Sequence, residues 1–217
     1  EGIYGKPTGK KVIYRVIADC LIKDNKVIEE WIIRDEKSIL NQLGIKVDDF
    51  VKQKISDGIY KKSDIDLIKN CFTIKNIIPH CESKNAKKYQ DYFSKIIKDQ
   101  KNVNKLYERS AQLYWIGGEV VYTFDKIFEK WKSFLSCFKI LKCEISNNIL
   151  LNQNNMRPRS SMRWRLICKH NKNGIFGLPT NKDIEIFGIS HAEFGKKGII
   201  REFILIDEIS IWKQILL

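Results

Sequence analysis

Apolar and polar residues alternate in two stretches near the start of the chain, and this pattern predicts a β-hairpin there. Residues 11–23 are rich in β-branched side chains, and Asp24-Asn25-Lys26 supplies turn residues before the alternation resumes at 27–34. A helical pattern follows at 36–43. Asp35 stands at the expected helix N-cap, where a short carboxylate accepts hydrogen bonds from the free amides of the first turn.

The same order of elements is predicted at the end of the chain. Strand-like sequence runs over residues 183–194, turn residues occupy 195–198, and the strand pattern returns at 199–206. A helical pattern follows at 208–216, behind a second candidate N-cap, Asp207. Each end of the chain is therefore predicted to form a hairpin followed by a short helix.

These two regions are copies of one sequence. The first opens with Gly-Ile-Tyr-Gly-Lys-Pro-Thr at Gly2 and the second with Gly-Ile-Phe-Gly-Leu-Pro-Thr at Gly174, a constant offset of 172 positions. Fifteen of the 42 pairs aligned at this offset are identical. The opening predicts a shaped turn rather than a phosphate-binding loop, because a strand follows it and the lysine-serine pair of a P-loop is missing. A repeat of this length indicates duplicated domains and not a solenoid.

Between the copies, the patterns predict helices first and strands afterwards. Residues 44–101 are polar and mainly helical, and we expect them to bridge two domains. A helical spacing runs over Val103–Trp115, and a second amphipathic helix is predicted at about 125–138 with Thr123 as its candidate cap. Strand-like segments complete this part of the chain at 143–151 and 161–169.

The predicted fold class is α+β, with helices covering one face of a curved sheet, and the unit is duplicated. Residues 1–43 are expected to be the C-terminal part of an incomplete first domain, and residues 102–217 a complete second domain. Because the first copy has almost nothing before Gly2, we expect the chain to be a fragment or processed part of a longer protein.

Composition favours a cytoplasmic protein. The chain has 217 residues and 43% hydrophobic content, which is enough to build a core, and no apolar run approaches the roughly 20 residues of a membrane span. The six cysteines form no CxxC pair and no zinc spacing, so we expect reduced thiols and no metal. Cys71, His80 and Cys81 come closest to a ligand set, but scattered structural residues explain them better.

The net charge of +13 does not by itself indicate a nucleic-acid partner. Lysines are spread along the whole chain, whereas nucleic-acid sites usually cluster arginine and lysine among aromatic residues or in a known module. The densest basic stretch holds half of the arginines: Arg157, Arg159, Arg163 and Arg165. Arg163 and Arg165 lie two positions apart in a strand-like run and therefore share one face.

Several segments of the second half together resemble the SnoaL-like polyketide cyclase group of the nuclear-transport-factor-2-like superfamily. They are Arg163-Trp164, His170, the turn at 174–180, Gly188-Ile189-Ser190-His191 and the run from Glu202 to Glu208. The resemblance implies a cone-shaped α+β barrel whose bent sheet wraps a helix and leaves an apolar pocket. It also implies a small hydrophobic ligand and no cofactor. Members include cyclases, hydrolases and isomerases as well as proteins that only bind or assemble, so the fold does not decide the function.

The resemblance also suggests site residues. In the cyclases, a pocket carboxylate or histidine removes a proton beside a carbonyl, and hydrogen-bond donors hold the enolate. His191 and His170 are the candidate acid–base groups, although either can equally be a structural histidine. The residues expected to bind the substrate are Arg163, Trp164, Arg165, Phe187 and Ser190. Ser190 lies where other members place a carboxylate, which argues against an aspartate-based mechanism here.

The first copy carries different residues at these positions, with Asp19 in place of His191 and Ala18 in place of Ser190. One domain is therefore expected to be active and the other structural. Two functions remain open: an acid–base enzyme acting on a small apolar carbonyl compound, or a non-catalytic binding or assembly domain that forms a homodimer or pairs the two units. Convergent polar groups in a cavity would favour the first, and a cavity filled by Trp164, Phe176 or Phe187 the second.

Overall fold

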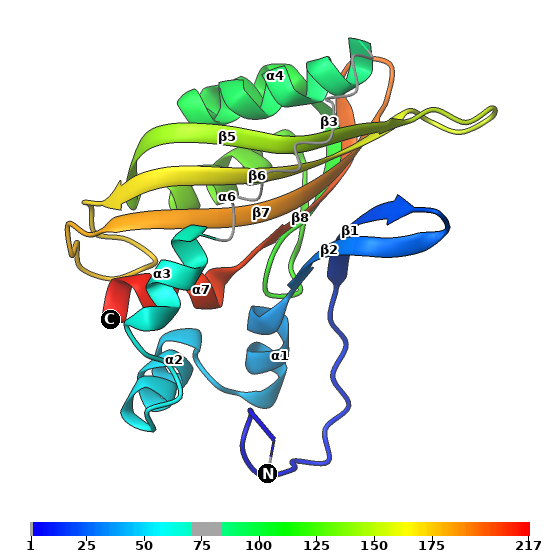
Figure 1. Cartoon of the computed structure of the whole chain (residues 1–217). Coiled ribbons are helices and arrows are strands. Elements are labelled where there is room, and N and C mark those ends of the chain that lie inside the picture. Colours follow the sequence, from blue (N-terminus) through cyan, green and yellow to red (C-terminus); the bar gives the residue numbers. More distant parts are fainter. Residues whose placement is uncertain (1, 71–83) are drawn as a thin grey trace.

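A computed structural model describes residues 2–70 and 84–217 of the protein (Figure 1). The segment that contains Cys71, His80 and Cys81 lies outside these residues. In the first part of the chain the elements are β1 (Val16–Lys23), β2 (Lys26–Arg34), α1 (Glu36–Leu43), α2 (Val47–Ser56) and α3 (Ser63–Asn70). The second part contains α4 (Lys84–Lys98), η2 (Gln100–Asn102), α5 (Val103–Leu106), β3 (Tyr107–Tyr114), β4 (Val120–Tyr122), α6 (Phe124–Leu135), β5 (Phe138–Leu151), β6 (Arg159–His170), β7 (Asp183–Phe194), β8 (Ile199–Ile206) and α7 (Glu208–Leu216).

The main sheet has six strands in the order β4-β3-β8-β7-β6-β5. Neighbouring strands are antiparallel except β3 and β8, which are parallel, so the sheet is mixed. The long strands β5 to β8 follow one another along the chain, and a short hairpin is added at the edge by β3 and β4. Together with its helices this sheet gives the α+β architecture that the patterns predicted.

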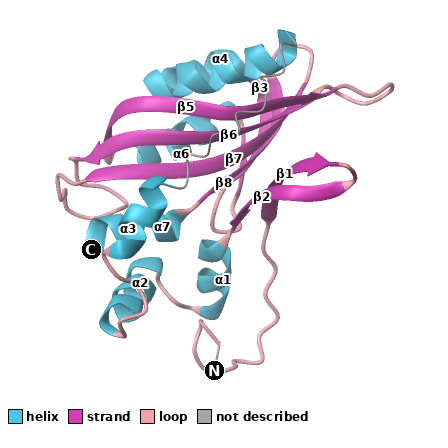
Figure 2. Ribbon diagram, viewed as in Figure 1, coloured by secondary structure: helices cyan, strands magenta, loops and turns pink. Residues whose placement is uncertain are grey.

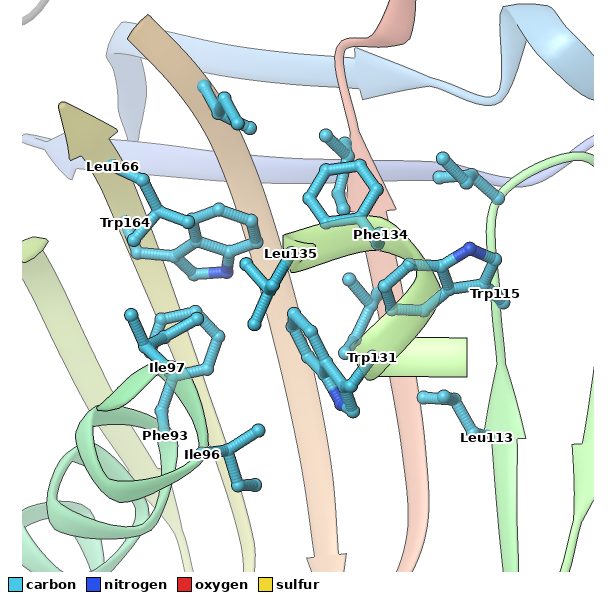
Figure 3. Close-up of a cluster of buried hydrophobic side chains, with 14 of the residues drawn as sticks. Phe93, Ile96, Ile97, Leu113, Trp115, Trp131, Phe134, Leu135, Trp164 and Leu166 are labelled. Atoms are coloured by element: carbon cyan, nitrogen blue, oxygen red, sulfur yellow. The ribbon is translucent and has the colours of Figure 1, made fainter. Parts of the chain in front are cut away.

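The hydrophobic core lies between the sheet and two helices. Helix α4 packs on β5 and β6, while α6 packs on β3. Figure 3 shows the rings of Phe93 from α4, Trp131 and Phe134 from α6 and Trp164 from β6 meeting in this space. Each of the four side chains is at most 1% exposed. Complete burial of a large apolar side chain contributes about 1.5–3 kcal/mol, so this face of the sheet provides much of the stability.

Trp164 also explains a glycine on the neighbouring strand. Gly188 is paired with Trp164 across β6 and β7, and a Cβ added to Gly188 would lie 2.0 Å from the indole ring. Only a residue without a side chain leaves room for the ring, because packed cores tolerate almost no overlap.

One helix prediction is wrong. The segment Val103–Trp115 was predicted as a helix, but only Val103–Leu106 is helical and Tyr107–Tyr114 forms strand β3. Its apolar residues fit either period over such a short stretch. The strand conformation is more stable than the helix here, because β3 pairs in parallel with the edge of β8 and buries Tyr107, Ala111 and Leu113 on the core side.

The predicted hairpins and the two aspartate caps are confirmed. Strands β1 and β2 and strands β7 and β8 form antiparallel pairs. The carboxylates of Asp35 and Asp207 accept hydrogen bonds from the amides of Ser38 and Ser210, at 3.1 and 3.0 Å. Thr123 occupies the N-cap position of α6, but its side chain makes no capping bond.

The two hairpins also agree in their detailed pairing. Ile17 faces Ile33 in the first, and Ile189 faces Leu205 in the second, again 172 positions later. A register shift follows Leu21 in the first hairpin, and one follows Glu193 at the equivalent place in the second.

The β1–β2 hairpin does not join the main sheet but lies against its outer face, away from α4 (Figure 2). Strand β1 contacts β7, and β2 contacts β8. Below it, α1, α2 and α7 enclose a small second core made of Leu40, Val47, Phe50, Val51 and Ile209. The β1–β2 hairpin therefore covers part of the sheet surface that the helices leave open.

Helix α4 falls within the segment expected to bridge two domains. Its apolar residues Tyr89, Phe93, Ile96 and Ile97 are buried in the main core, so this end of the segment packs as part of the cone. Among the described residues, no helix is long and apolar enough to cross a membrane. The described cysteines, Cys20, Cys137, Cys143 and Cys168, are free thiols.

Candidate functional site

The predicted site residues lie on two opposite faces of the main sheet. Side chains alternate along a strand, so residues of unlike parity point to different sides. The residues that face the core are Trp164, His170 and Ser190, and those that face outward are Arg163, Arg165, Phe187 and His191. The structure therefore does not bring these seven residues into one site.

His191 is exposed in a groove on the outer face. The groove has a volume of about 600 Å³, and its lining combines apolar residues, among them Ile149, Leu151 and Phe203, with the charged residues Arg159, Glu193 and Arg201. Partial desolvation lowers the pKa of His191, and the nearby carboxylate of Asp19 opposes this shift. His191 is thus mainly neutral near pH 7, as a general base must be.

His170 is buried at the other end of the sheet. Its ring lies 5.6 Å from the ring of Phe138, and its Nδ1 is 3.3 Å from the Thr180 hydroxyl. Its Nε2 has no hydrogen-bond partner among the described residues. Burial lowers its pKa. Ser161, the strand partner of His191, lies nine positions along β6 from His170, about 30 Å away, so the two histidines cannot act on one small substrate.

The outward-facing arginines are held by carboxylates. Arg165 forms ion pairs with Glu144 and Glu185, the latter at 3.0 Å. Arg163 lies 3.7 Å from Asp19 and 3.6 Å from Glu29, both on the β1–β2 hairpin. These contacts attach neighbouring strands to one another and the hairpin to the sheet.

Arg163 makes one further contact with the hairpin. Its guanidinium carbon lies 4.3 Å from the centre of the Trp31 ring, within the range of a cation–π interaction. Arg163 therefore holds the hairpin on the sheet and does not line the interior of the cone.

Inside the cone, the structure brings together a group of polar side chains centred on Glu202. Glu202 is 1% exposed. The Tyr89 hydroxyl donates to its Oε1 at 2.6 Å, and the Tyr107 hydroxyl donates to its Oε2. Nearby, the Trp164 indole N–H donates to the Ser190 hydroxyl at 2.7 Å. The Glu202 carboxyl and two tyrosine hydroxyls thus converge from strand β8, helix α4 and strand β3.

This environment changes the proton affinity of Glu202. Burial raises the pKa of the Glu202 carboxyl to about 7, although the hydroxyls of Tyr107 and Tyr89 favour the ionised form and oppose the rise. Burial and the neighbouring carboxyl raise the pKa of both tyrosines. A carboxyl poised near neutral pH beside neutral hydroxyl donors can both accept and return a proton.

A large groove lies next to this group. Its volume is about 1110 Å³, and its walls include Tyr107, which bonds to Glu202, and Phe194, whose ring lies 5.9 Å from that of Tyr89. The cationic residues that line it are Lys105, Arg109, Arg157, Lys196 and Lys197, against one acidic residue, Glu108.

Sequence reasoning missed Glu202 as a site residue, although a signal was present. Glu202 is the one acidic residue in the strand Ile-Ile-Arg-Glu-Phe-Ile-Leu-Ile, but the resemblance includes it only as the first residue of the run from Glu202 to Glu208. Its inward direction follows from the parity of β8, which the hairpin pattern predicted. Its partners could not be predicted from the sequence. Tyr89 lies in the segment predicted to bridge two domains, and Tyr107 lies in a predicted helix.

Comparison with known proteins rests on structure alone. No protein-family model and no curated protein sequence matches this chain. TsrD from Streptomyces laurentii aligns with a TM-score of 0.50 at 6% identity, over 62% of this chain and 97% of TsrD. A proposed SnoaL-like polyketide cyclase from Jannaschia sp. CCS1 has the same score and identity, over 62% of this chain and 96% of its own.

AclR, a proposed hydroxylase from Streptomyces galilaeus, aligns with a TM-score of 0.50 at 11% identity, over 60% of this chain and 84% of AclR. At such low identity the likeness shows the fold: about 60% of the chain has the SnoaL-like, nuclear-transport-factor-2-like architecture. Within the described residues, no three histidine, cysteine or acidic side chains are grouped as metal ligands would be.

Proposed function

We propose that this protein binds a small carbonyl compound and moves a proton on it without a cofactor, with Glu202 as the acid–base group. The observation that carries the proposal is the buried Glu202 carboxyl, with a pKa of about 7 and two tyrosine hydroxyls bonded to it. General acid–base catalysis works best when the catalytic pKa lies near the working pH. The SnoaL-like fold supports the proposal, because the group lies inside the cone.

The proposed step is an enolisation. Ionised Glu202 takes the proton from the carbon beside the substrate carbonyl, and the electron pair of the broken C–H bond moves to the carbonyl oxygen. A tyrosine hydroxyl donates a hydrogen bond to the resulting enolate, which stabilises the charge where it develops. Glu202 then returns the proton to carbon or oxygen, so the step is an isomerisation or the first half of a ring closure.

Tyr107 has a central place in this proposal, since it both lines the large groove and bonds to Glu202. A substrate in the groove therefore meets Tyr107 before it meets the carboxyl. The excess of basic side chains around the groove favours a substrate that carries or develops negative charge. Trp164 and Ser190, predicted from sequence as binding residues, form the inner wall beside Tyr89 in this proposal.

Deuterium exchange into α-tetralone, a small apolar ketone, tests the proposal. We expect wild-type protein to accelerate exchange at the carbon beside the carbonyl, and Glu202→Gln to lose about 100-fold or more of that acceleration. Glu30→Gln is the matched control, because Glu30 is the exposed equivalent of Glu202 in the first copy. The wild-type rate should rise with pH through about 7, where burial places the pKa of Glu202.

His191→Ala and His170→Ala distinguish the two histidines predicted from sequence. Exchange that survives Glu202→Gln but disappears in His191→Ala would move the chemistry to the outer groove and overturn the assignment. Absence of any acceleration by the wild-type protein would remove the enzymatic proposal and leave the second candidate below.

The second candidate function is assembly, and two observations favour it. Trp164 and Phe93 fill part of the cone interior with their rings 4.9 Å apart, which leaves less room for a ligand. In addition, the β1–β2 hairpin repeats the strand pairing of β7 and β8 and lies on the outer face of the sheet. We infer that the two regions are copies of one domain end, and that the chain pairs its two units through this face.

A further inference from the structure

We infer that the cavity beside Asp207 is a docking site for a backbone turn of a partner polypeptide that supplies the helical layer and the β3–β4 turn of the same cone-shaped fold, bound through two successive amide groups of that turn. The inference rests on the equivalence of residues 1–43 and 174–217 proposed above. It is independent of any acid–base chemistry at Glu202. Its physical basis is a contact that the structure already contains once, at Asp35.

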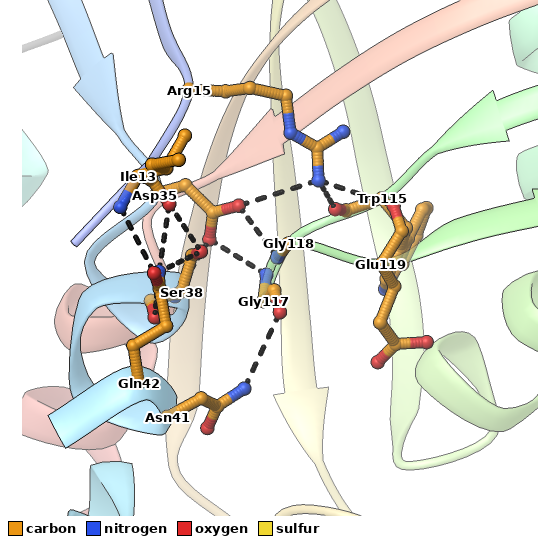
Figure 4. Close-up of polar contacts among 10 residues, drawn as sticks. All are labelled: Ile13, Arg15, Asp35, Ser38, Asn41, Gln42, Trp115, Gly117, Gly118 and Glu119. Carbon is orange, nitrogen blue, oxygen red and sulfur yellow. Dashed lines mark hydrogen bonds and ion pairs between the residues drawn. The ribbon is translucent and has the colours of Figure 1, made fainter. Parts of the chain in front are cut away.

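Asp35 holds the turn between β3 and β4 (Figure 4). The amide of Gly117 donates to Asp35 Oδ1 at 2.7 Å, and the amide of Gly118 donates to Oδ2 at 3.0 Å. Asp35 also caps α1 through the Ser38 amide, and it is 1% exposed. One buried carboxylate therefore ends a helix and binds a turn from a distant part of the chain.

The shape of that turn depends on glycine. Gly117 and Gly118 have φ angles of +82° and +76°, in the left-handed region that other residues rarely adopt. A Cβ on Gly118 would also lie 2.8 Å from the Ser38 hydroxyl. The Arg15 guanidinium completes the contact by donating to the carbonyl oxygens of Trp115 and Glu119 (Figure 4).

The equivalent residues of the second copy line two cavities. At the offset of 172 positions, Asp207 corresponds to Asp35 and Ser210 to Ser38. Asp207 and Ser210 border a cavity of about 210 Å³. Asp207 also borders a second cavity of about 330 Å³.

Two more residues of the second copy, each equivalent to a residue near the Gly117-Gly118 turn, line these cavities. Phe187, which corresponds to Arg15, lines the smaller cavity. Ile209, which corresponds to Lys37, lines the larger one. The equivalents of the residues around the Gly117-Gly118 turn thus border cavities in the second copy, and Ile32 and Ile33 of strand β2 line both cavities.

Asp207 has accepting capacity to spare. The Ser210 amide is the one hydrogen-bond donor to its carboxylate within the described part of the chain, whereas Asp35 has three amide donors. Burial raises the pKa of Asp207, and the hydrogen bond from the Ser210 amide and the charge of Lys213 oppose the rise. A turn that presents two amides would supply the missing bonds.

The uncovered face of the first hairpin indicates what kind of partner carries the turn. Ile22 and Ile32 are 64% and 45% exposed, while their equivalents Phe194 and Ile204 are 5% and 0% exposed. In the second unit, the face that carries Phe194 and Ile204 is covered by the helical layer. Strand β3 pairs with the edge of β8 that β7 leaves open. A partner that supplies the helices and the edge strand of such a unit to this hairpin would cover the face and present the turn, so the face and the cavity call for one occupant.

A cyclic peptide of residues 111–123 serves as the probe, used once its cross-strand NOEs show the hairpin. It is added to the ¹⁵N-labelled full chain, and amide shifts are followed by NMR. We expect shifts to cluster at Asp207, Ile209 and Ser210. Asp207→Asn should weaken binding about tenfold or more, because asparagine still caps the helix but offers one acceptor in place of two.

Two controls separate this site from other outcomes. The same peptide with Ala-Ala in place of Gly117-Gly118 should not bind, since its turn cannot adopt the required φ angles. The Glu202→Gln chain should bind like wild type, so failure of the acid–base proposal leaves this test intact. Shifts at Asp35 only, no shifts at all, or equal binding by the Asp207→Asn chain would overturn the inference.

Discussion

Glu202 shows how a single residue gains its chemistry from its surroundings. In water its carboxyl would be fully ionised near pH 7. In strand β8 its neighbours on the same face are Ile200 and Ile204, and it faces the core, where the cost of burying a charge exceeds the stabilisation by the hydroxyls of Tyr89 and Tyr107. The carboxyl consequently holds its proton to a higher pH. Burying this carboxyl also lowers the free energy of unfolding of the protein, and ionisable groups with such perturbed pKa values cluster at functional sites.

The first prediction concerns stability and pH. The folded-state pKa of Glu202 is about 7 and the ordinary value is 4.5, so between these values the folded protein holds a proton that the unfolded chain has released. Stability should therefore fall as pH rises from about 4.5 to 7, by on the order of 3 kcal/mol from this group, and level off above. Urea unfolding at pH 5 and pH 8 should show this loss in wild type and a smaller one in Glu202→Gln. Equal losses in both proteins would contradict the assigned pKa.

Among the residues chosen from sequence, parity along the strands explains which ones meet. Trp164 and Ser190 face the core and bond to each other, while Arg163 and His191 face outward. The alternation itself is readable from sequence. Which side of a strand becomes the interior is decided by the helices that cover it, and the distance between the histidines follows from strand pairing.

At the level of elements, specific local signals in the sequence predicted the boundaries of helices and strands correctly. Hairpin turns and the aspartate caps predicted the boundaries of β7, β8, α1 and α7, because turns and caps depend on residues close in sequence. Strand β3 was mistaken for a helix because its eight residues are stabilised as a strand by pairing with β8, far along the chain.

The second prediction compares the two caps. Asp207→Ala removes a helix cap and should cost about 1 kcal/mol of the free energy of unfolding. Asp35→Ala removes an equivalent cap and also the acceptors of the Gly117 and Gly118 amides, so it should cost about 3 kcal/mol or more. Urea unfolding of both variants measures the difference. Asp35→Asn, which keeps the cap, separates the two contributions, and equal losses for the two alanine variants would contradict this account.

At the scale of the whole molecule, the β1–β2 hairpin packs as a separate layer on the outer face of the main sheet. Arg163, 8% exposed, joins the layers through Asp19, Glu29 and the ring of Trp31. A buried arginine between two carboxylates stabilises the contact between the layers, because its removal leaves both acids without their counter-charge.

The third prediction tests whether Arg163 holds the β1–β2 hairpin on the sheet. In Arg163→Met, which keeps the apolar bulk, we expect the amides of β1 and β2 to exchange with deuterium about tenfold faster, while those of β6 and β7 keep their protection. Hydrogen exchange followed by NMR gives both values in one experiment. Arg201→Met is the control, since Arg201 is exposed and pairs only with Glu193. Uniform loss of protection across the sheet would show that Arg163 supports the whole fold and not the hairpin alone.

The sequence by itself determined the duplicated segment, the α+β class and the hairpin-helix ends, because repeats, alternation and caps are local properties of the chain. Only the tertiary structure decided that Glu202 meets Tyr89 and Tyr107, that His191 and His170 lie far apart, and that the β1–β2 hairpin covers part of the outer face. The physical reason is that burial and contact between distant segments depend on how sheets and helices pack. That packing sets which polar groups lose water, and so which of them acquire an unusual proton affinity.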